Sequence, residues 1–324
     1  MLLIWVTPLI SGPAIVIDTG QKQDGSYTHA ALNGIQRWTQ KTGLTVDEFE
    51  VQAHETREHA ITRAAQSGSS PIIVLGCAFS HAIRRVAPQY QRTQFVVLDA
   101  IVDQPNVKSI TFRVQESSYL VGMLAAMLTK TGTISFIGGM DMPCLRAFSC
   151  GYAQGAHAIN SRVKLLESRI GNTVQAWNSP EMGAKHAAFH VDKGSDIIFS
   201  AAGYSNKGVM QQATDLKIRS IGVDINQNHV HPGFVITSMI KSVDIAVYQT
   251  LMEGDHLMLG HHDLGLAEGA VDYVIDDHNR VLITDAIKSK LDHARHAIVT
   301  GTLKVHNYLS DQSCPVSIQQ LRPD

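Results

Sequence analysis

The sequence predicts an α/β protein of two doubly wound lobes, each a parallel sheet with helices on both faces. Two observations support this prediction. Apolar, β-branched runs of strand length alternate with helix-length segments, and the alternation restarts after Gly132. The runs are apolar throughout instead of alternating with polar residues, as expected for strands that helices cover on both sides.

Ten runs have the length and composition of strands. They are residues 14–18, 44–51, 71–76, 94–99, 107–113, 133–139, 164–170, 196–202, 219–224 and 234–240. Nine segments between or after them are candidate helices. These are Ser26–Thr42, Glu55–Gln66, Phe79–Pro88, Glu116–Lys130, Pro143–Asn160, Glu181–Asp192, Lys207–Leu216, Val243–Glu253 and Ala286–Thr300. Strand–helix–strand order with short loops implies right-handed parallel crossovers.

We expect the seam between the lobes near residues 112–115. No low-complexity linker marks this seam, so several short crossings should join the lobes. The expected first lobe is residues 1–113 plus 241–262, and the expected second lobe is residues 114–240 plus 263–324.

Composition excludes several classes of protein. A chain of 324 residues with 44% hydrophobic content can bury one large core or two medium ones. A net charge of −2, with no stretch rich in Lys and Arg, argues against nucleic-acid binding. No run of apolar residues is long enough to cross a membrane as a helix. Residues 2–13 are apolar but lack a basic start, so both a signal-peptide remnant and an ordinary beginning of the chain stay open.

The four cysteines do not form a disulfide scaffold or a CxxC motif. Cys144 and Cys150 are close enough in sequence to pair in an oxidising compartment. Two free thiols are the interpretation that we favour.

Charged, aromatic and glycine residues follow the strands at the ends where open parallel sheets bind ligands. In the first lobe these residues are Asp18, Phe79 and Asp99, and in the second they are Trp177, Gly203, Asp224 and Lys241. Carboxylates accept hydrogen bonds from hydroxyl and amino groups, and aromatic faces stack on flat rings. The set therefore suits a neutral, polyhydroxylated ligand with a flat ring and suits a phosphate poorly. For any single Asp the alternative is a simple helix cap.

No catalytic or metal-binding pattern is present in the sequence. "HETREH", residues 54–59, is not the HExxH motif of zinc proteases, and "GYSNKG", residues 203–208, lacks the end of a phosphate loop. No GxSxG elbow occurs, and the sixteen histidines show no repeated ligand spacing. We therefore expect neither an enzyme nor a cofactor.

Six blocks, spread over residues 14–307, carry a family resemblance. They are "DTGQKQDGSYT", "FVVLDAIVDQPNVKSITFRVQESSYLVGMLAA", "ISFIGGMDMPCLRAFSCGYAQGA", "DIIFSAAGYSNKGV", "IGVDINQ" and "ITSMIKSVDIAV". Their order and spacing resemble the basic membrane protein family of solute-binding proteins, which includes purine nucleoside receptor lipoproteins of ABC importers. The sequence departs from the family pattern at a few positions, namely Tyr27, Thr28, Tyr204, Asn206 and Asn226.

The resemblance implies a type I periplasmic-binding fold with a purine nucleoside between the lobes. By position, it implies that Asp18 and Asp99 meet the base and that Tyr27 stacks on it. The remaining ligand-binding residues that it implies are Asp24, Thr28, Phe79, Trp177, Gly203, Asp224 and Lys241. Among these, Gly203, Asp224 and Lys241 would hold the ribose hydroxyls. We expect Ser26 to cap the helix that carries Tyr27.

Two function classes follow from the resemblance. The favoured one is the solute-binding protein of an ABC importer, a monomer that binds a nucleoside and a membrane permease. It would lie in the periplasm or at the outer face of the cytoplasmic membrane. The alternatives are a ligand sensor on the same fold and a binding protein for another sugar-like solute.

Overall fold

The computed structural model describes residues 12–18, 20 and 22–323, and the chain divides into two compact units. Unit 1 comprises Met1–Thr19, Ala31–Thr111 and Asp244–Asp263, and unit 2 comprises Gly20–Ala30, Phe112–Val243 and Leu264–Asp324. Residues 2–11 of the apolar start, for which a signal-peptide remnant was considered, lie outside the described residues. The short segment Gly20–Ala30 belongs to unit 2, although the chain on both sides of it belongs to unit 1.

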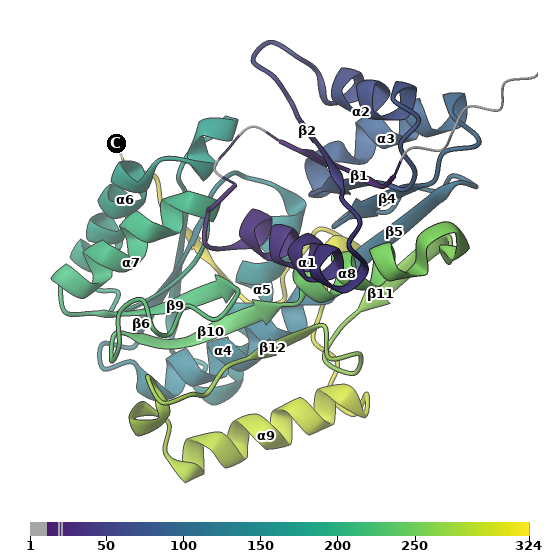
Figure 1. The fold of residues 1–324 in the computed structure, drawn as a ribbon. Coiled ribbons are helices and arrows are strands. Elements are labelled where there is room, and N and C mark those ends of the chain that lie inside the picture. Colours follow the sequence, from purple (N-terminus) through teal and green to yellow (C-terminus); the bar gives the residue numbers. More distant parts are fainter. Residues whose placement is uncertain (1–11, 19, 21, 324) are drawn as a thin grey trace, which may run out of the picture. The chain divides into compact units, whose positions relative to one another are not determined.

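Both units contain a mainly parallel sheet (Figure 1). The strands of unit 1 are β1 (Ala14–Ile17), β2 (Asp47–Glu50), β3 (Ile72–Leu75), β4 (Phe95–Leu98), β5 (Val107–Phe112) and β11 (Gly260–Leu264). Those of unit 2 are β6 (Thr133–Gly138), β7 (Lys164–Arg169), β8 (Ile197–Ala201), β9 (Arg219–Asp224), β10 (Val235–Lys241), β12 (Val271–Tyr273) and β13 (Gln319–Gln320).

The two sheets repeat one topology. Unit 1 has the order β2-β1-β3-β4-β5-β11, and unit 2 has the order β7-β6-β8-β9-β10-β12, with β13 added beside β7. The first five strands of each order pair in parallel, whereas β12 is antiparallel to β10. Each strand of unit 1 therefore has an equivalent by position in unit 2, and β4 corresponds to β9.

Each of the nine predicted helices is present. They are α1 (Tyr27–Thr42), α2 (Arg57–Gln66), α3 (Ser80–Val86), α4 (Val114–Leu128), α5 (Pro143–Ile159), α6 (Pro180–Asp192), α7 (Asn206–Asp215), α8 (Val243–Glu253) and α9 (Asp285–Val299). The ten predicted strands also form, although β2 is shorter than expected and mostly exposed. The short strands β11, β12 and β13 were not predicted, because their sequences lack an apolar run.

Helices cover both faces of the unit 2 sheet. Successive residues of a strand point to opposite faces, so Phe136 and Phe199 share one face and Ile137 and Ile198 the other. Tyr152 of α5 packs with its ring centroid 5.3 Å from that of Phe199. Ile137 and Ile198 instead cluster with residues of α6 and α7.

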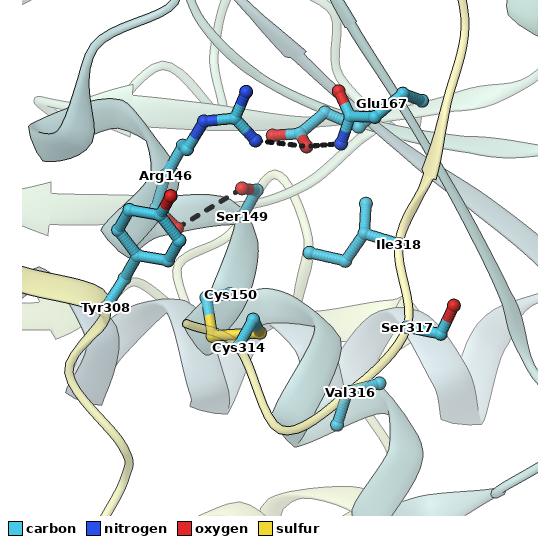
Figure 2. A pocket seen from close by; sticks show the side chains of 10 residues that line it. Arg146, Ser149, Cys150, Glu167, Tyr308, Cys314, Val316, Ser317 and Ile318 are labelled. Atoms are coloured by element: carbon cyan, nitrogen blue, oxygen red, sulfur yellow. Dashed lines mark hydrogen bonds and ion pairs between the residues drawn. A yellow bond between two sulfur atoms is a disulfide. The ribbon is translucent and has the colours of Figure 1, made fainter. Parts of the chain in front are cut away.

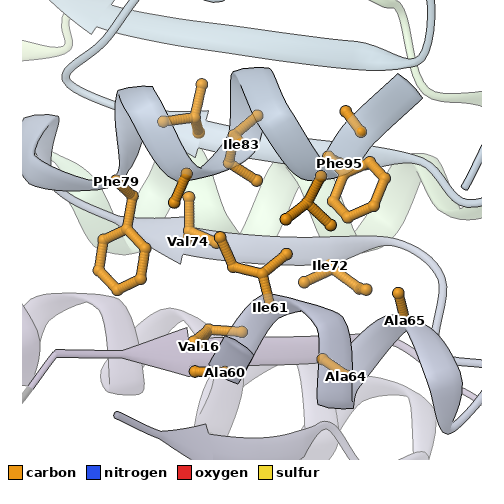
Figure 3. Packing of buried hydrophobic residues seen from close by; sticks show 14 of the residues in the cluster. Val16, Ala60, Ile61, Ala64, Ala65, Ile72, Val74, Phe79, Ile83 and Phe95 are labelled. Carbon is orange, nitrogen blue, oxygen red and sulfur yellow. The ribbon is translucent and has the colours of Figure 1, made fainter. Parts of the chain in front are cut away.

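The core of unit 1 is an apolar layer between the sheet and helices α2 and α3 (Figure 3). Val16, Ile72 and Val74 from the strands pack with Ile61 of α2 and Ile83 of α3, and all five are fully buried. Burial of this kind is the dominant favourable term in folding.

Glycines bring α4 and α5 of unit 2 into backbone contact. A Cβ atom added at Gly155 would lie 1.8 Å from the carbonyl oxygen of Tyr119, and one at Gly122 would lie 2.1 Å from that of Tyr152. Gly151 makes the same approach to Gln115. The resemblance blocks "ESSYLVG" and "GYAQGA" therefore encode a close helix–helix contact in this chain.

The cysteine prediction was wrong. Cys150 of α5 forms a disulfide with Cys314, 164 residues further along the chain, and not with Cys144. Within the described residues no cysteine is a free thiol. The favoured interpretation, two free thiols, failed because sequence spacing carries no signal for partners that only the folded chain brings together.

A buried Ser–His–His cluster joins β7 to α6. The hydroxyl of Ser168 lies 2.8 Å from Nδ1 of His186 and 2.7 Å from Nε2 of His190. Within the described part of the chain, Nδ1 of His190 is buried without a hydrogen-bond partner. We therefore assign the His190 proton to Nε2, which donates to Ser168, and Ser168 donates to His186. Burial lowers the pKa of His190 to about 3 and also lowers the pKa of His186.

The Gly155→Ala variant should be destabilised by about 3 kcal/mol or more, because its methyl group would overlap the Tyr119 carbonyl. Chemical denaturation measures this change in the free energy of unfolding. Gly171→Ala is the control, since its added Cβ would only touch the Cβ of Ala176 at 3.4 Å. Equal stability of the two variants would show that α4 and α5 can separate without cost.

Acid should weaken the fold through His190. Its pKa is about 3 in the folded state and about 6.5 in the unfolded state, so only the unfolded chain gains this proton between those pH values. The free energy of unfolding should fall with decreasing pH more steeply in the wild type than in His190→Gln. The expected difference is about 1.4 kcal/mol per pH unit below pH 6.5. Identical slopes in denaturation series from pH 6.5 to 4.5 would contradict this assignment.

Candidate functional site

The carboxyl ends of the unit 2 strands gather three of the predicted site residues. Asp224 ends β9 and Lys241 ends β10, and these strands are parallel neighbours with Asp224 opposite Ile240. Gly203 follows β8, which pairs with both β6 and β9. Because parallel strands end at one edge of a sheet, these residues share that edge, as the sequence predicted.

Asp224 is held in an unusual backbone conformation. Its φ angle is 65°, a left-handed value that costs free energy for a residue with a side chain. Asp99 follows β4, the unit 1 equivalent of β9, and its φ angle is 64°. Such conformations persist where the surrounding structure fixes them, and they cluster at binding and catalytic sites. Both units thus present a conformationally strained aspartate at the same position of their sheets.

The hydroxyl of Ser26 donates a hydrogen bond to Oδ2 of Asp224. Ser26 is fully buried, and Asp224 is 7% exposed. A second bond supports this contact, because the Gln227 side chain donates from Nε2 to the Gly25 carbonyl at 2.7 Å. The other end of the Gln227 amide accepts from the Val223 N–H at 2.8 Å. These bonds fasten the segment before α1 to the end of β9.

Asp24 caps α1, and the expectation that Ser26 would do so was wrong. Oδ1 of Asp24 accepts from the N–H groups of Ser26 and His29, at 2.8 and 3.0 Å, and Oδ2 accepts from that of Thr28 at 3.1 Å. This carboxylate satisfies backbone donors that the first turn of a helix leaves without partners. Ser26 is thereby left to bond Asp224 instead.

Lys241 lies among aromatic rings. Its Nζ atom is 4.5 Å from the ring centroid of Tyr27, 5.0 Å from that of Phe112 and 6.0 Å from that of Phe148. An ammonium group at these distances is attracted by the ring faces, more strongly when it is shielded from water. Lys241 is only 4% exposed. The structure therefore brings the predicted residues Tyr27, Asp224 and Lys241 together.

Trp177 packs against two glycines. It ends a short 3-10 turn, Val174–Trp177, and is half-buried. A Cβ atom added at Gly139 would lie 2.4 Å from the Trp177 ring, and one at Gly203 would lie 3.2 Å from the Trp177 carbonyl oxygen. Gly203 also has a φ angle of 57°, which favours glycine. The hydroxyl of Ser205 also fixes this turn, because it donates to the Ala176 carbonyl at 2.8 Å.

In unit 1, Arg57 forms an ion pair with the carboxylate of Asp18. Nε and one terminal nitrogen of Arg57 lie 2.9 and 2.5 Å from Oδ2 of Asp18. The guanidinium carbon is 5.6 Å from the ring centroid of Phe79. Phe79 itself is fully buried in the unit 1 core, so the structure gives it a packing role. Sequence reasoning missed Arg57, because residues 54–59 were compared only with the HExxH motif.

The loop after β9 explains one departure from the family pattern. Asn226 is one of the positions at which the sequence departs from the family pattern, and its Nδ2 donates to Oδ2 of Asp276 at 2.8 Å. Burial alone would raise the pKa of Asp276, but hydrogen bonds from Asn226, the His278 backbone and Asn228 hold it below its usual value. An aspartate at position 226 would set two carboxylates against each other. Asn226 thus fits the Asp276 of this chain.

This arrangement has the chemistry of a binding site for a hydroxylated ligand. A carboxylate, an ammonium group and aromatic faces gather at one sheet edge, where they can bond hydroxyl groups and stack on a ring. Among the described residues no group of three or more His, Cys, Asp or Glu side chains could hold a metal ion. In that part of the chain, no helix is long and apolar enough to span a bilayer.

Comparisons with known proteins agree on one family. The family model described as "ABC transporter substrate-binding protein PnrA-like" matches residues 13–307. Basic membrane protein A of Borreliella afzelii is 29% identical over 300 residues, covering 88% of each chain. The ABC transporter nucleoside-binding protein BmpA of Lactococcus lactis subsp. cremoris is 29% identical over 320 residues, covering 90% of this chain and 88% of that protein.

Solved structures show the same fold. An ABC transporter solute-binding protein from Aeropyrum pernix K1 superposes with a TM-score of 0.81 at 23% identity, covering 90% of this chain and 92% of that one. A transcriptional activator of the comK gene from Bacillus halodurans gives a TM-score of 0.73 at 18% identity, covering 91% of this chain and 100% of that one. The fold is therefore the type I periplasmic-binding fold. Because the family model matches residues 13–307, which is most of the chain, the chain belongs to the Bmp family of PnrA-like ABC transporter substrate-binding proteins.

Proposed function

We propose that this protein binds a purine nucleoside for an ABC importer and delivers it to a membrane permease. Family membership supports the transport role, and a substrate-binding protein of an importer works outside the cytoplasm. A relative at 29% identity is named as a nucleoside-binding protein. The observation that carries the proposal is the neighbouring placement of Asp224 and Lys241 beside the ring of Tyr27.

In the proposed complex, Asp224 and Lys241 recognise the ribose. A carboxylate accepts several hydrogen bonds at once, so Asp224 can keep the bond from Ser26 and accept from a ribose hydroxyl. The Lys241 ammonium donates to a neighbouring hydroxyl oxygen. Charge-assisted hydrogen bonds of this kind are stronger than neutral ones. Gly203 lets the ligand approach the backbone closely, as a residue without a side chain can.

The aromatic residues would hold the base. Tyr27 would stack on the base, and Trp177 would contribute a second aromatic ring. Stacking of this kind accepts any purine, because every base has a π-face. We extend the proposal to Asp18 and Asp99 of unit 1, which would accept from N–H groups of the base. Arg57 would then hold Asp18 in place, while Asp24 and Thr28 act through the start of α1. Phe79 stays outside the proposed site because it belongs to the core.

Removing the Trp177 ring, or displacing it from its contact with Gly139, should weaken nucleoside binding. Trp177→Ala is expected to lose about 1–3 kcal/mol of binding free energy, by analogy with stacking of bases on aromatic side chains. Gly139→Ala should act in the same direction, because its methyl group would displace the ring. Affinity and melting temperature are measured on both variants, with Gly171→Ala as the control. A lower melting temperature with unchanged affinity would make Trp177 a packing residue only.

Ribonucleosides should bind at least about tenfold more tightly than their 2′-deoxy forms, because a site built for a hydroxyl leaves polar groups unpaired without it. Titration calorimetry with adenosine, inosine, guanosine and their deoxy forms measures the ratio. Asp224→Asn should remove most of this preference. Asp196→Asn is the matched control, because Asp196 precedes β8 at the opposite end of the sheet. If the wild type bound each ribonucleoside and its 2′-deoxy form with equal affinity, the assignment of Asp224 and Lys241 to the ribose would be wrong.

A further inference from the structure

The C-terminal tail closes over a cavity in unit 2 (Figure 2). The cavity has a volume of about 280 Å³ and lies between α5, β7 and the tail. Both sulfur-bearing residues of the Cys150–Cys314 disulfide line it, together with Arg146 of α5 and Tyr308 and Ile318 of the tail. The family match ends at residue 307, so this tail lies beyond the part of the chain that the family model covers.

Few backbone bonds hold the end of the tail. β13 pairs with β7 over two residues, Gln319 with Leu166 and Gln320 with Glu167. The Leu321 N–H donates to the Glu167 carbonyl at 2.6 Å, and the Gln320 side chain donates to the Glu167 carboxylate. A ladder this short is marginal by itself. The disulfide therefore adds a covalent attachment to a segment with few backbone bonds.

The tail covers a sheet edge that has little protection of its own. In unit 1 the equivalent edge strand β2 has the sequence Asp-Glu-Phe-Glu, with its three carboxylates exposed. Charges of this kind discourage pairing with another chain. In unit 2, β7 has the sequence Lys-Leu-Leu-Glu-Ser-Arg, and four of its residues are buried. Release of the tail would uncover this strand.

The two sulfur atoms of the disulfide have different surroundings. Cys150 is 1% exposed, and the Gln154 amide donates to its Sγ atom at 3.4 Å from the next turn of α5. Arg146, one turn before Cys150, lines the same cavity, but its guanidinium group is paired with the Asp141 carboxylate. Cys314 lies on the tail and is half-buried. A hydrogen-bond donor stabilises a thiolate, and attack on the more accessible Cys314 expels Cys150, so Cys150 is the leaving group.

We propose that the cavity is a thiol-exchange site through which a dithiol reductant opens the Cys150–Cys314 bond and frees the tail. A thiolate of the reductant attacks Sγ of Cys314, forms a mixed disulfide with it and expels Cys150 as a thiolate. The second thiolate of the reductant then attacks the reductant sulfur that is bonded to Cys314, and Cys314 leaves as a thiolate. The reductant becomes a cyclic disulfide, and the two protein thiolates take up the two protons that the dithiol lost.

Opening the bond leaves β13 held by its two-residue ladder and by the bonds of Gln320 and Leu321 to Glu167. The tail then exchanges between bound and free states, and β7 becomes an accessible edge. The proposal concerns a site apart from the ligand-binding residues, so it holds whether or not the protein binds nucleosides.

Trapping with a monothiol tests the direction of attack. The folded protein is incubated with glutathione, quenched by alkylation and mapped by mass spectrometry, with intrinsic fluorescence confirming that it stays folded. The mixed disulfide should form on Cys314 at least about tenfold more often than on Cys150. Preference for Cys150, or reaction of this bond only after the protein unfolds, would overturn the proposal.

Reduction with dithiothreitol tests the consequence. Hydrogen exchange at the amides of residues 319–321 should accelerate by about tenfold or more once Cys150 and Cys314 are reduced. Gln154→Leu should slow the reduction several-fold, because it removes the donor to Sγ of Cys150, whereas Arg162→Gln, on the exposed loop after α5, should not. Unchanged exchange in the reduced protein would show that the disulfide does not hold the tail, and equal rates for the two variants would remove Gln154 from the mechanism.

Discussion

The hydrogen bond from Ser26 to Asp224 is the contact on which the candidate site depends. It ties a segment that begins a helix to the end of β9, nearly two hundred residues away. The bond from Gln227 to Gly25 reinforces it, and together they place Tyr27 beside Lys241. Asp224 has the backbone conformation that this geometry needs, at a cost that the surrounding bonds offset. Without this contact the aromatic ring and the two charged groups would belong to separate parts of the chain.

The residues that carry the family resemblance serve two different purposes. Some lie at strand ends, where a ligand can reach them. Others make the unit itself possible, since Gly122, Gly151 and Gly155 bring two helix backbones into contact. Glu116 is of the second kind, because it accepts from Nε of Arg113 at 2.8 Å and from the Leu266 N–H at 2.8 Å. A motif shared with a binding family therefore does not identify binding residues until a structure shows which atoms they contact.

Much of the fold could be predicted from the sequence because its signal is local. Long apolar runs separated by helix-length segments specify the order of the elements, and parallel crossovers follow from that order. The short strands β11, β12 and β13 escaped prediction, because they take their structure from the strands they pair with. The Cys150–Cys314 bond escaped for a similar reason, since 164 residues separate its partners and only the folded chain brings them together.

The candidate site was predicted in type but not in detail. Asp224 and Lys241 could be placed at one edge, because each ends an apolar strand. The cap of α1 was assigned to Ser26, although Asp24 has two oxygens and accepts from three backbone donors there. Arg57 and Gln227 were missed because each acts through a distant partner, Asp18 or Gly25, that no local pattern reveals.

Ligand-induced stabilisation tests the central claim most directly. The melting temperature of the purified protein is measured against a panel of nucleosides, free bases, sugars and amino acids. A ligand at one hundred times its dissociation constant should add about 2.7 kcal/mol to the free energy of unfolding. We expect purine ribonucleosides to raise the melting temperature most, with free bases and free sugars having little effect. A rise with a sugar or an amino acid, and none with any nucleoside, would contradict nucleoside binding.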